Sequence, residues 1–135
     1  MNSRFTSQIT VRPDDIDMNQ HVHYSRYFDY VLAARYDQMA RCYGLSMEEF
    51  QTRGYTWFVR TAHFDYKRPL KLGDTAVVTT WVDSFSRHGV QVKFEVTRIQ
   101  DNKSCGEGYC DYTLISLATG RATALPVWAI EQYSV

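Results

Sequence analysis

The sequence lacks an apolar run long enough to cross a membrane as a helix. Its longest apolar stretches cover 30–34 and 125–130, whereas a membrane-spanning helix needs roughly 18 or more apolar residues. The opening residues, MNSRFTSQIT, contain neither an apolar core nor a small-residue cleavage site, so we expect no signal peptide. These absences predict a cytoplasmic protein with no membrane partner.

The sequence also lacks net charge and a paired-cysteine motif. Lysine plus arginine number 15, as do aspartate plus glutamate, whereas a dedicated nucleic-acid-binding domain would normally be basic. We therefore expect no nucleic-acid partner. The three cysteines form no C-x-x-C pair, which fits reduced thiols in a cytosol. His21, His23 and His63 show no zinc-binding spacing with Asp17, so we expect neither a metal nor another cofactor.

What is present is the composition of an ordinary globular domain. The 135 residues are 44% hydrophobic and 22% charged, a typical soluble balance, and the chain is long enough to bury a core. No repeat, linker or low-complexity stretch interrupts it. We expect one domain over 1–135.

Hydrophobic spacing predicts two helices after a first strand over 5–13 and a polar loop over 14–20. From about 25 to 43 the period is helical, and Gly44 is placed to end the helix. Ser46 and Glu49 form a capping-box pattern that opens a second helix before Gly54. The residues expected on the apolar face of the long helix are Phe28, Val31, Leu32, Arg35 and Met39.

The remaining sequence predicts consecutive strands. Segments 56–66, 75–86 and 105–116 are strand-like, and alternation from Val90 to Val96 indicates a strand with one buried face. A last strand near 122–125 and a short helix after Pro126 complete the expectation. One strand, one long helix and then a run of strands favour an α+β fold, with an antiparallel sheet wrapped around one long central helix. A generic α+β sandwich and a partly open barrel are the alternatives.

The segment before the long helix gathers reactive side chains. Residues 14–23, DDIDMNQHVH, contain three carboxylates and two imidazoles. A helix N-terminus offers unpaired N–H groups to an oxyanion, and a carboxylate beside it can act as general base or as nucleophile on a carbonyl. Spacing alone favours the plainer interpretation, in which these residues cap the helix and solvate a loop.

Three motifs resemble the 4-hydroxybenzoyl-CoA thioesterase family. They are DIDMNQHVHYSRY at 15–27, followed by a helix with A-A-R, then FDYKRPLKLGD at 64–74 and GRATALP at 120–126. Together they cover nearly the whole chain in the family's order. The resemblance implies a hotdog fold, thioester hydrolysis and an active site shared between two subunits.

The resemblance also implies roles for individual residues. The second carboxylate of D-x-D, Asp17, would be catalytic, activating water or attacking the thioester to form an anhydride, whereas Asp15 would be structural. Backbone N–H groups around Val22 to Tyr24 would polarise the carbonyl. Arg35 is either a structural ion pair or a snorkelling side chain. Alternatively, because related hotdog thioesterases use an arginine near this helical position, it orients the carboxylate or binds the carbonyl.

Further site residues follow from their place in these motifs. Tyr24 and His23 join Asp17 and Arg35 as catalytic candidates. Single arginines are more often solvated, and aromatic side chains are more often core, but some would contact coenzyme phosphates or line a pocket suited to a short or aromatic acyl group. The candidates for substrate binding are His21, Val22, Tyr27, Phe58, Arg68 and Arg87.

The chain departs from the family pattern at a few positions. Gln20 replaces a usual glycine, His23-Tyr24 replaces Asn-Asn or Tyr-His, and Gly89 stands where a serine often approaches the coenzyme phosphates. These differences bear on substrate and phosphate contacts rather than on the fold.

The sequence therefore predicts a thioesterase that hydrolyses an acyl-CoA or an acyl-carrier-protein thioester and assembles as a homodimer or homotetramer. A non-catalytic acyl-CoA-binding hotdog domain, acting as a sensor or scaffold, is the rival. Asp17 and the lack of an attached DNA-binding segment argue against it. A hotdog dehydratase is a second rival, but its Asp/His arrangement does not occur here.

Overall fold

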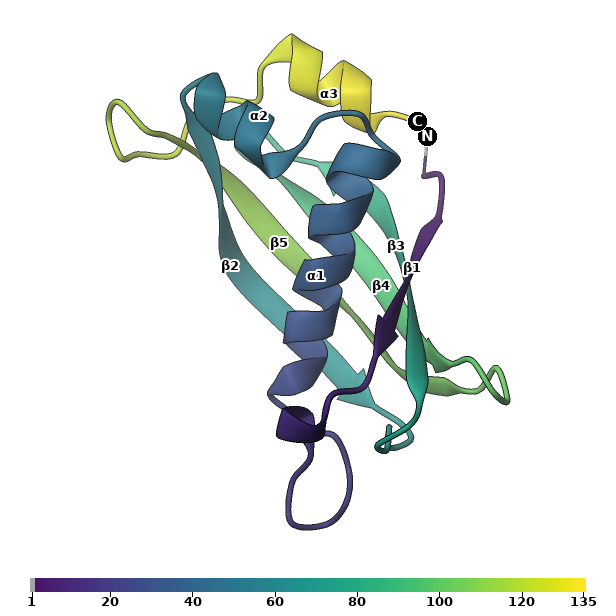
Figure 1. Ribbon diagram of the computed structural model, residues 1–135. Helices are drawn as coiled ribbons and strands as arrows, with labels where there is room; N and C mark the ends of the chain where they lie inside the picture. Colours follow the sequence, from purple (N-terminus) through teal and green to yellow (C-terminus); the bar gives the residue numbers. More distant parts are fainter. Residues whose placement is uncertain (1) are drawn as a thin grey trace.

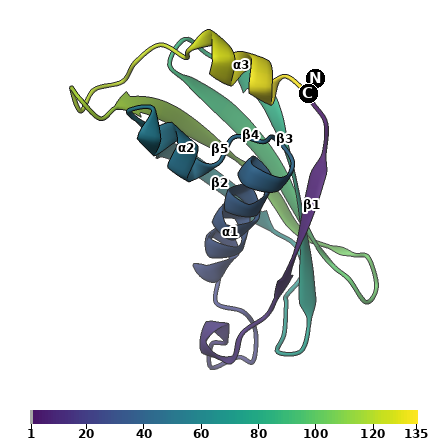
Figure 2. The same ribbon diagram turned by 45° about the horizontal axis from the view of Figure 1, so that its top comes forward.

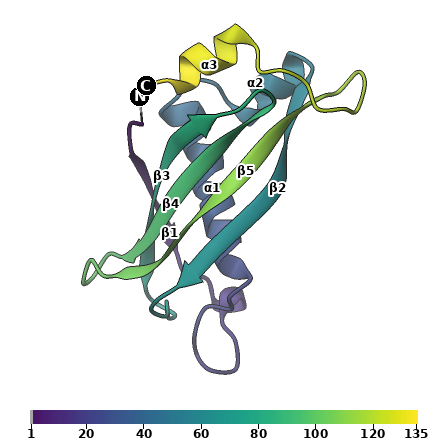
Figure 3. The ribbon, with the colours of Figure 1, turned by 180° about the vertical axis from the view of Figure 1, so that it is seen from behind.

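The computed structural model describes residues 2–135. Five strands form one antiparallel sheet in the order β1-β3-β4-β5-β2. Helix α1, Arg26–Arg41, lies across one face of this sheet (Figure 1), and the opposite face carries no helix (Figure 3). The predicted sheet wrapped around one long helix is confirmed. The strands are β1 Phe5–Thr10, β2 Tyr55–Tyr66, β3 Thr75–Phe85, β4 Gly89–Arg98 and β5 Ser104–Ser116.

Helix α1 buries a face that differs in part from the predicted one. Val31, Arg35 and Met39 are buried as expected, at the spacing of an amphipathic helix. The prediction that Leu32 lies on the buried face was wrong, because Leu32 is 42% exposed. Gln38, which was not predicted there, is completely buried. The Gln38 amide donates to the Ser7 hydroxyl at 3.0 Å and accepts from the Thr80 hydroxyl. A satisfied hydrogen-bond network thus places a polar residue where periodicity favours an apolar one.

Two short helices lie beside the C-terminal end of α1 (Figure 2). Helix α2, Met47–Thr52, begins at Ser46, whose hydroxyl accepts the Glu49 N–H at 3.1 Å as the capping pattern predicts. Helix α3 is Val127–Tyr133. No helix within residues 2–135 is long and apolar enough to span a membrane.

The predicted strand near 122–125 was wrong. Ala122 makes one isolated bridge to Ile115, and the Leu125 N–H donates to the Arg87 carbonyl oxygen at 3.1 Å. The segment therefore crosses from β5 to the β3–β4 turn, and it does not extend the sheet.

The apolar interior divides into two clusters along α1. Val31, Leu70 and Phe94 belong to the cluster at the N-terminal end. Met39 and Phe50 belong to the cluster at the other end, which α2 and α3 close. Arg35 lies on α1 between them, so a charged side chain interrupts the core.

Strand β2 is an edge of the sheet and contains a bulge. Its pairing with β5 shifts register between Val59 and Thr61. Trp57 packs on the second cluster and Phe64 on the first, although their odd spacing would put them on opposite faces of a regular strand. The extra residue of the bulge restores the common face.

Candidate active site

The loop that precedes α1 closes on itself through backbone hydrogen bonds. The Asp17 N–H donates to the His21 carbonyl at 2.8 Å, and the Gln20 N–H donates to the Asp17 carbonyl at 3.1 Å. Ile16 and Val22 form an antiparallel bridge. Gln20 has a φ of 66°, a left-handed conformation that favours glycine. The turn therefore explains why a glycine is usual at this position in the family that the motifs resemble.

This loop holds the Asp17 carboxylate by one of its two oxygens. Oδ1 accepts the Asn19 N–H at 2.8 Å and the His21 N–H at 3.3 Å. Within residues 2–135, Oδ2 makes no hydrogen bond or ion pair. Because the first oxygen fixes the side chain, the second is oriented and available to a reactant.

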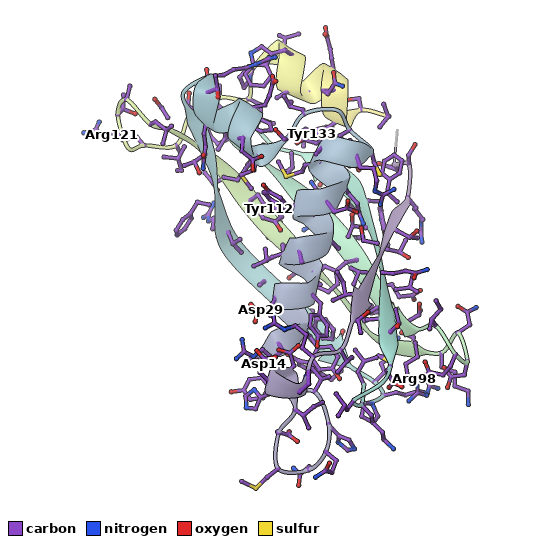
Figure 4. All side chains as sticks on the ribbon, viewed as in Figure 1. Asp14, Asp29, Arg98, Tyr112, Arg121 and Tyr133 are labelled. Carbon is purple, nitrogen blue, oxygen red and sulfur yellow. The ribbon has the colours of Figure 1, made fainter. Side chains whose placement is uncertain are left out.

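Asp17 borders a hollow of about 330 Å³ at the N-terminal end of α1, the end where Figure 4 labels Asp14 and Asp29. The structure thus brings together six of the predicted site residues with three others. The hollow is lined by Asp17, His21, Val22, Tyr24, Tyr27, Tyr66, Lys67, Arg68 and Pro69.

The sequence predicted that the backbone amides at this end of α1 polarise a thioester carbonyl, but not all of them are free to do so. The Val22 N–H donates to the Leu70 carbonyl and the His23 N–H to the Asp15 carbonyl, both at 2.8 Å. Because these donors are already used inside the fold, the prediction that amides from Val22 to Tyr24 polarise a carbonyl was wrong for the first two. The Tyr24 N–H has no acceptor within the described residues, so it is the candidate donor that remains.

Asp15 is buried and held by two side chains. The Tyr30 hydroxyl donates to Oδ2 at 2.6 Å, and the Arg26 guanidinium lies 3.6 Å from Oδ1. Burial, and then the hydrogen bond to Asp15, raise the pKa of Tyr30, so its hydroxyl keeps its proton. These contacts agree with the structural role expected for Asp15.

His23 and Tyr66 help to shape the helix start. The His23 Nδ1 accepts the Ser25 N–H at 3.2 Å and lies 2.7 Å from the Ser25 hydroxyl, and His23 is not among the residues that line the hollow. Tyr66 donates its hydroxyl hydrogen bond to the Tyr24 carbonyl at 2.8 Å and lines the hollow. Sequence reasoning missed Tyr66 as a site residue, although it belongs to the second motif.

Three predicted site residues lie away from the hollow in this chain. Arg35 is nine residues beyond Arg26, which places it about 13 Å farther along the axis of α1. Phe58 is 61% exposed on β2. Arg87 lies in the turn between β3 and β4, so the length of a strand, roughly 30 Å, separates it from the end of the sheet near Asp17. No hydrogen bond or ion pair joins Arg35 to Asp17 within residues 2–135.

The two basic residues of the hollow have partners on β5 or at its start. Lys67 pairs with Glu107 at 2.9 Å, and Arg68 donates to the Ser104 carbonyl at 2.9 Å. Both side chains are exposed, so they keep donors for an anion at the rim. The described chain contains no group of three or more His, Cys, Asp or Glu side chains placed to hold a metal ion.

Comparisons with known proteins agree on the fold and the family. The chain is 24% identical over 119 residues to the long-chain acyl-CoA thioesterase FadM of Escherichia coli, covering 88% of this chain and 89% of that protein. The DHNA-CoA thioesterase of Staphylococcus aureus has a TM-score of 0.88 at 21% identity, covering 97% of this chain and 89% of that one. Protein SAV2348 of Staphylococcus aureus, solved in complex with CoA, has a TM-score of 0.84 at 25% identity, covering 99% and 81%.

These likenesses confirm the hotdog fold, while membership of the narrower 4-hydroxybenzoyl-CoA thioesterase family rests on the motifs alone. A family model described as the thioesterase-like superfamily matches residues 11–132. Because the match includes every strand of the sheet except the first, together with α1 and the loop before it, the chain belongs to the thioesterase-like superfamily.

Proposed function

We propose that the protein hydrolyses an acyl thioester of coenzyme A at the hollow beside Asp17. The observation that carries this proposal is the Asp17 carboxylate, whose Oδ1 is anchored by two backbone amides while Oδ2 is free at the edge of the hollow. A free carboxylate oxygen and an unused backbone N–H, on two residues that line one hollow, are groups that can catalyse acyl transfer.

In this proposal the Tyr24 N–H donates to the thioester carbonyl oxygen and stabilises the negative charge that develops there. Oδ2 of Asp17 removes a proton from water, whose oxygen adds to the carbonyl carbon. The C–S bond then breaks, and the thiolate leaves and takes up a proton. In the other route Oδ2 attacks the carbonyl directly, and water hydrolyses the resulting anhydride. Labelling of Asp17 after a single turnover in water enriched in heavy oxygen would identify the second route, because water that adds to the Asp17 carbonyl of the anhydride leaves its oxygen on Asp17.

The thiol carrier follows from the rim of the hollow and from the relatives. Lys67 and Arg68 add positive charge beside Asp17, where the coenzyme's phosphates would bind. FadM is named as an acyl-CoA thioesterase, and SAV2348 was solved with CoA. These facts favour coenzyme A as the carrier, with an acyl-carrier-protein thioester as the alternative substrate.

A second copy of the chain would complete the site. β2 is an edge strand whose Phe58 and Val59 are exposed, and free strand edges pair readily. A two-fold axis through the middle of β2 pairs it antiparallel with its copy, which lays the Tyr66 end of one strand beside the Tyr55 end of the other. Three predicted site residues lie far from the hollow of their own chain, toward the Tyr55 end of β2. In the dimer, the partner would bring its copies of these residues to the hollow. They are Arg35, Phe58 and Arg87.

The test is a panel of acyl-CoA thioesters with a thiol-reactive dye that reports released coenzyme A. We expect turnover of at least one member, with no loss of activity on treatment with a chelator. Tight binding of one thioester without turnover of any would contradict hydrolysis and support the non-catalytic binding domain instead.

A further inference from the structure

Arg35 is a buried cation without a counter-ion. Its side chain is 7% exposed, and Nη1 is buried without a hydrogen-bond acceptor. No ion pair to Arg35 occurs within residues 2–135, and a guanidinium does not lose its proton in a protein. A buried charge without a partner costs several kcal/mol of folding free energy. The position therefore requires an anion or acceptor that this chain does not itself provide.

The side chains around Arg35 are neutral. Its guanidinium lies 5.4 Å from the centre of the Tyr43 ring, and burial raises the pKa of Tyr43, Tyr112 and Tyr133. Burial likewise raises the pKa of the Cys110 thiol to about 11. None of these groups is ionised near neutral pH, so none of them compensates the charge.

A second unused donor lies in the same place. The Tyr112 hydroxyl is buried and has no hydrogen-bond partner among residues 2–135, whereas the Tyr133 hydroxyl already donates to the Leu45 carbonyl at 3.0 Å. Figure 4 labels Tyr112 on β5 behind α1 and Tyr133 near the C-terminal end of that helix. Arg35 and Tyr112 thus offer two unused donors at one place, and a carboxylate can accept both.

Both donors border a small cavity between α1 and the sheet. Its volume is about 20 Å³, enough for a group the size of one water molecule but too small for a whole acyl chain. Apart from Arg35 and the tyrosines, the lining is apolar and consists of Met39, Met47, Trp57, Val82 and Val90. Apolar walls around two unused donors fit the polar terminus of an otherwise apolar chain.

We propose that this cavity binds the terminal carboxylate of the acyl group, so that the preferred substrates are ω-carboxyacyl thioesters. Arg35 Nη1 and the Tyr112 hydroxyl both donate to the carboxylate oxygen that enters this water-sized cavity. This inference rests on the proposed function and narrows its substrate class. A bound water would satisfy the hydrogen bonds but would leave the charge uncompensated, which is why the carboxylate is the better occupant.

The path from thioester to carboxylate runs through the proposed pairing of two chains. Trp57 and Met47 form the wall of the cavity near the β2 edge, beside which the partner's hollow would lie. The acyl length that reaches Arg35 is then set by the distance across this pairing, so substrates of several lengths are compared.

The experiment compares matched pairs of substrates on the intact wild-type protein. The mono-CoA esters adipoyl-, suberoyl- and sebacoyl-CoA are measured against hexanoyl-, octanoyl- and decanoyl-CoA. We expect kcat/KM to favour the carboxylated member by roughly 10- to 100-fold at one chain length, the range for a hydrogen bond to a charged group. Equal kcat/KM within every pair would overturn the proposal.

Variants identify the residues responsible. Arg35→Met is similar in length and uncharged, and it should abolish the preference for the carboxylated member of each pair. Tyr112→Phe should reduce the preference partly. An equal loss on both members of a pair with Arg35→Met would overturn the proposal, because it indicates a contact with the thioester carbonyl. If Arg35→Met fails to fold, Tyr112→Phe provides a comparison without a change of charge, and Arg35→Lys, which keeps the charge but loses the planar fork, should retain part of the preference.

Direct binding separates this inference from the proposed function. Calorimetry with free suberate and octanoate needs no hydrolysis. Suberate binding to wild type but not to Arg35→Met supports the carboxylate site even if no thioester is hydrolysed. If the protein hydrolyses thioesters but binds suberate no better than octanoate, the carboxylate site is overturned while the proposed hydrolase function stands.

Discussion

The hydroxyl of Tyr30 donates a 2.6 Å hydrogen bond to the carboxylate of Asp15, and both side chains are buried. This contact ties the first residue of the first motif to α1. Because Asp15 also accepts the His23 N–H through its backbone carbonyl, the pair fixes the position at which the chain enters the helix. The loop that holds Asp17 is thus anchored by a side chain that does not itself line the hollow.

Tyr30→Phe should therefore destabilise the protein without changing its chemistry. Removing the hydroxyl leaves a buried carboxylate oxygen without its donor, which costs about 1–3 kcal/mol of unfolding free energy. Chemical denaturation measures this loss, and kcat per folded molecule should be unchanged. Tyr36→Phe is the matched control, because Tyr36 also bonds a carboxylate, that of Glu48, but is 52% exposed. Equal losses in both variants would contradict the role given to the buried pair.

Asp17→Asn tests the catalytic carboxylate. The amide keeps the shape of the side chain and an oxygen for the Asn19 N–H, but it can neither take up a proton nor attack a carbonyl. Positioned acid–base groups contribute about 10² to 10⁴ in rate, so kcat should fall at least ~100-fold while substrate binding survives. Asp14→Asn is the control, since Asp14 is exposed and pairs with Arg12. Turnover by Asp17→Asn within a few-fold of wild type would disprove the mechanism.

The left-handed conformation of Gln20 predicts how substitutions at this position rank in protein stability. Gln20→Gly should be tolerated, because the left-handed strain that it relieves, about 1–2 kcal/mol, exceeds the added freedom of the unfolded chain, about 0.4–1 kcal/mol. Gln20→Val should destabilise the protein, because a β-branched residue is a strong outlier at a φ of 66°. Thermal unfolding ranks the variants, and a valine variant as stable as the glycine variant would refute the assigned strain.

Self-association through β2 predicts a mass above that of one chain. Light scattering at micromolar concentration should report at least twice 15.8 kDa. Phe58→Lys puts a charge on the exposed edge and should shift the mass toward one chain and lower activity with it. Ile99→Lys is the control, because Ile99 is 48% exposed but lies outside β2. A wild-type mass near 15.8 kDa would contradict both the proposed dimer and the site shared between two chains.

The cysteines differ in their expected reaction with a thiol dye. Burial raises the pKa of both Cys105 and Cys110 to about 11, so near neutral pH these thiols stay protonated and unreactive. Cys42 is partly exposed. We expect one fast-reacting thiol in the native protein, and Cys42→Ser should remove it and lower the background of the coenzyme A assay. Fast labelling that persists in Cys42→Ser would contradict this assignment.

Local sequence patterns predicted the helices and strands. The features that these patterns did not predict depend on contacts between residues far apart in the sequence. The capping pattern at Ser46 and the alternation along β4 depend on neighbours in sequence, and both are confirmed. The burial of Gln38 depends on Ser7 and Thr80, which lie far away along the chain, and therefore periodicity alone did not predict it.

The same distinction applies to the candidate site. The first motif predicted Asp17, His21, Val22, Tyr24 and Tyr27, and all of them border the hollow. It did not indicate that the Val22 N–H is taken by Leu70, a residue on another loop. The spacing of the helix placed Arg35 on its buried face, but it gave no indication that the guanidinium has no partner.

The bulge in β2 lets one strand contribute side chains to both ends of the proposed binding site. Its first half turns Trp57 toward the Arg35 cavity, and its second half turns Tyr66 toward the Asp17 hollow. Deleting Arg60 would make the spacing from Trp57 to Phe64 even, so a regular strand without the bulge would still turn both side chains to the same face. The deletion would instead remove the local bend and added twist that a bulge gives a strand, so its effect is expected on the shape of this sheet edge and not on which side chains face inward.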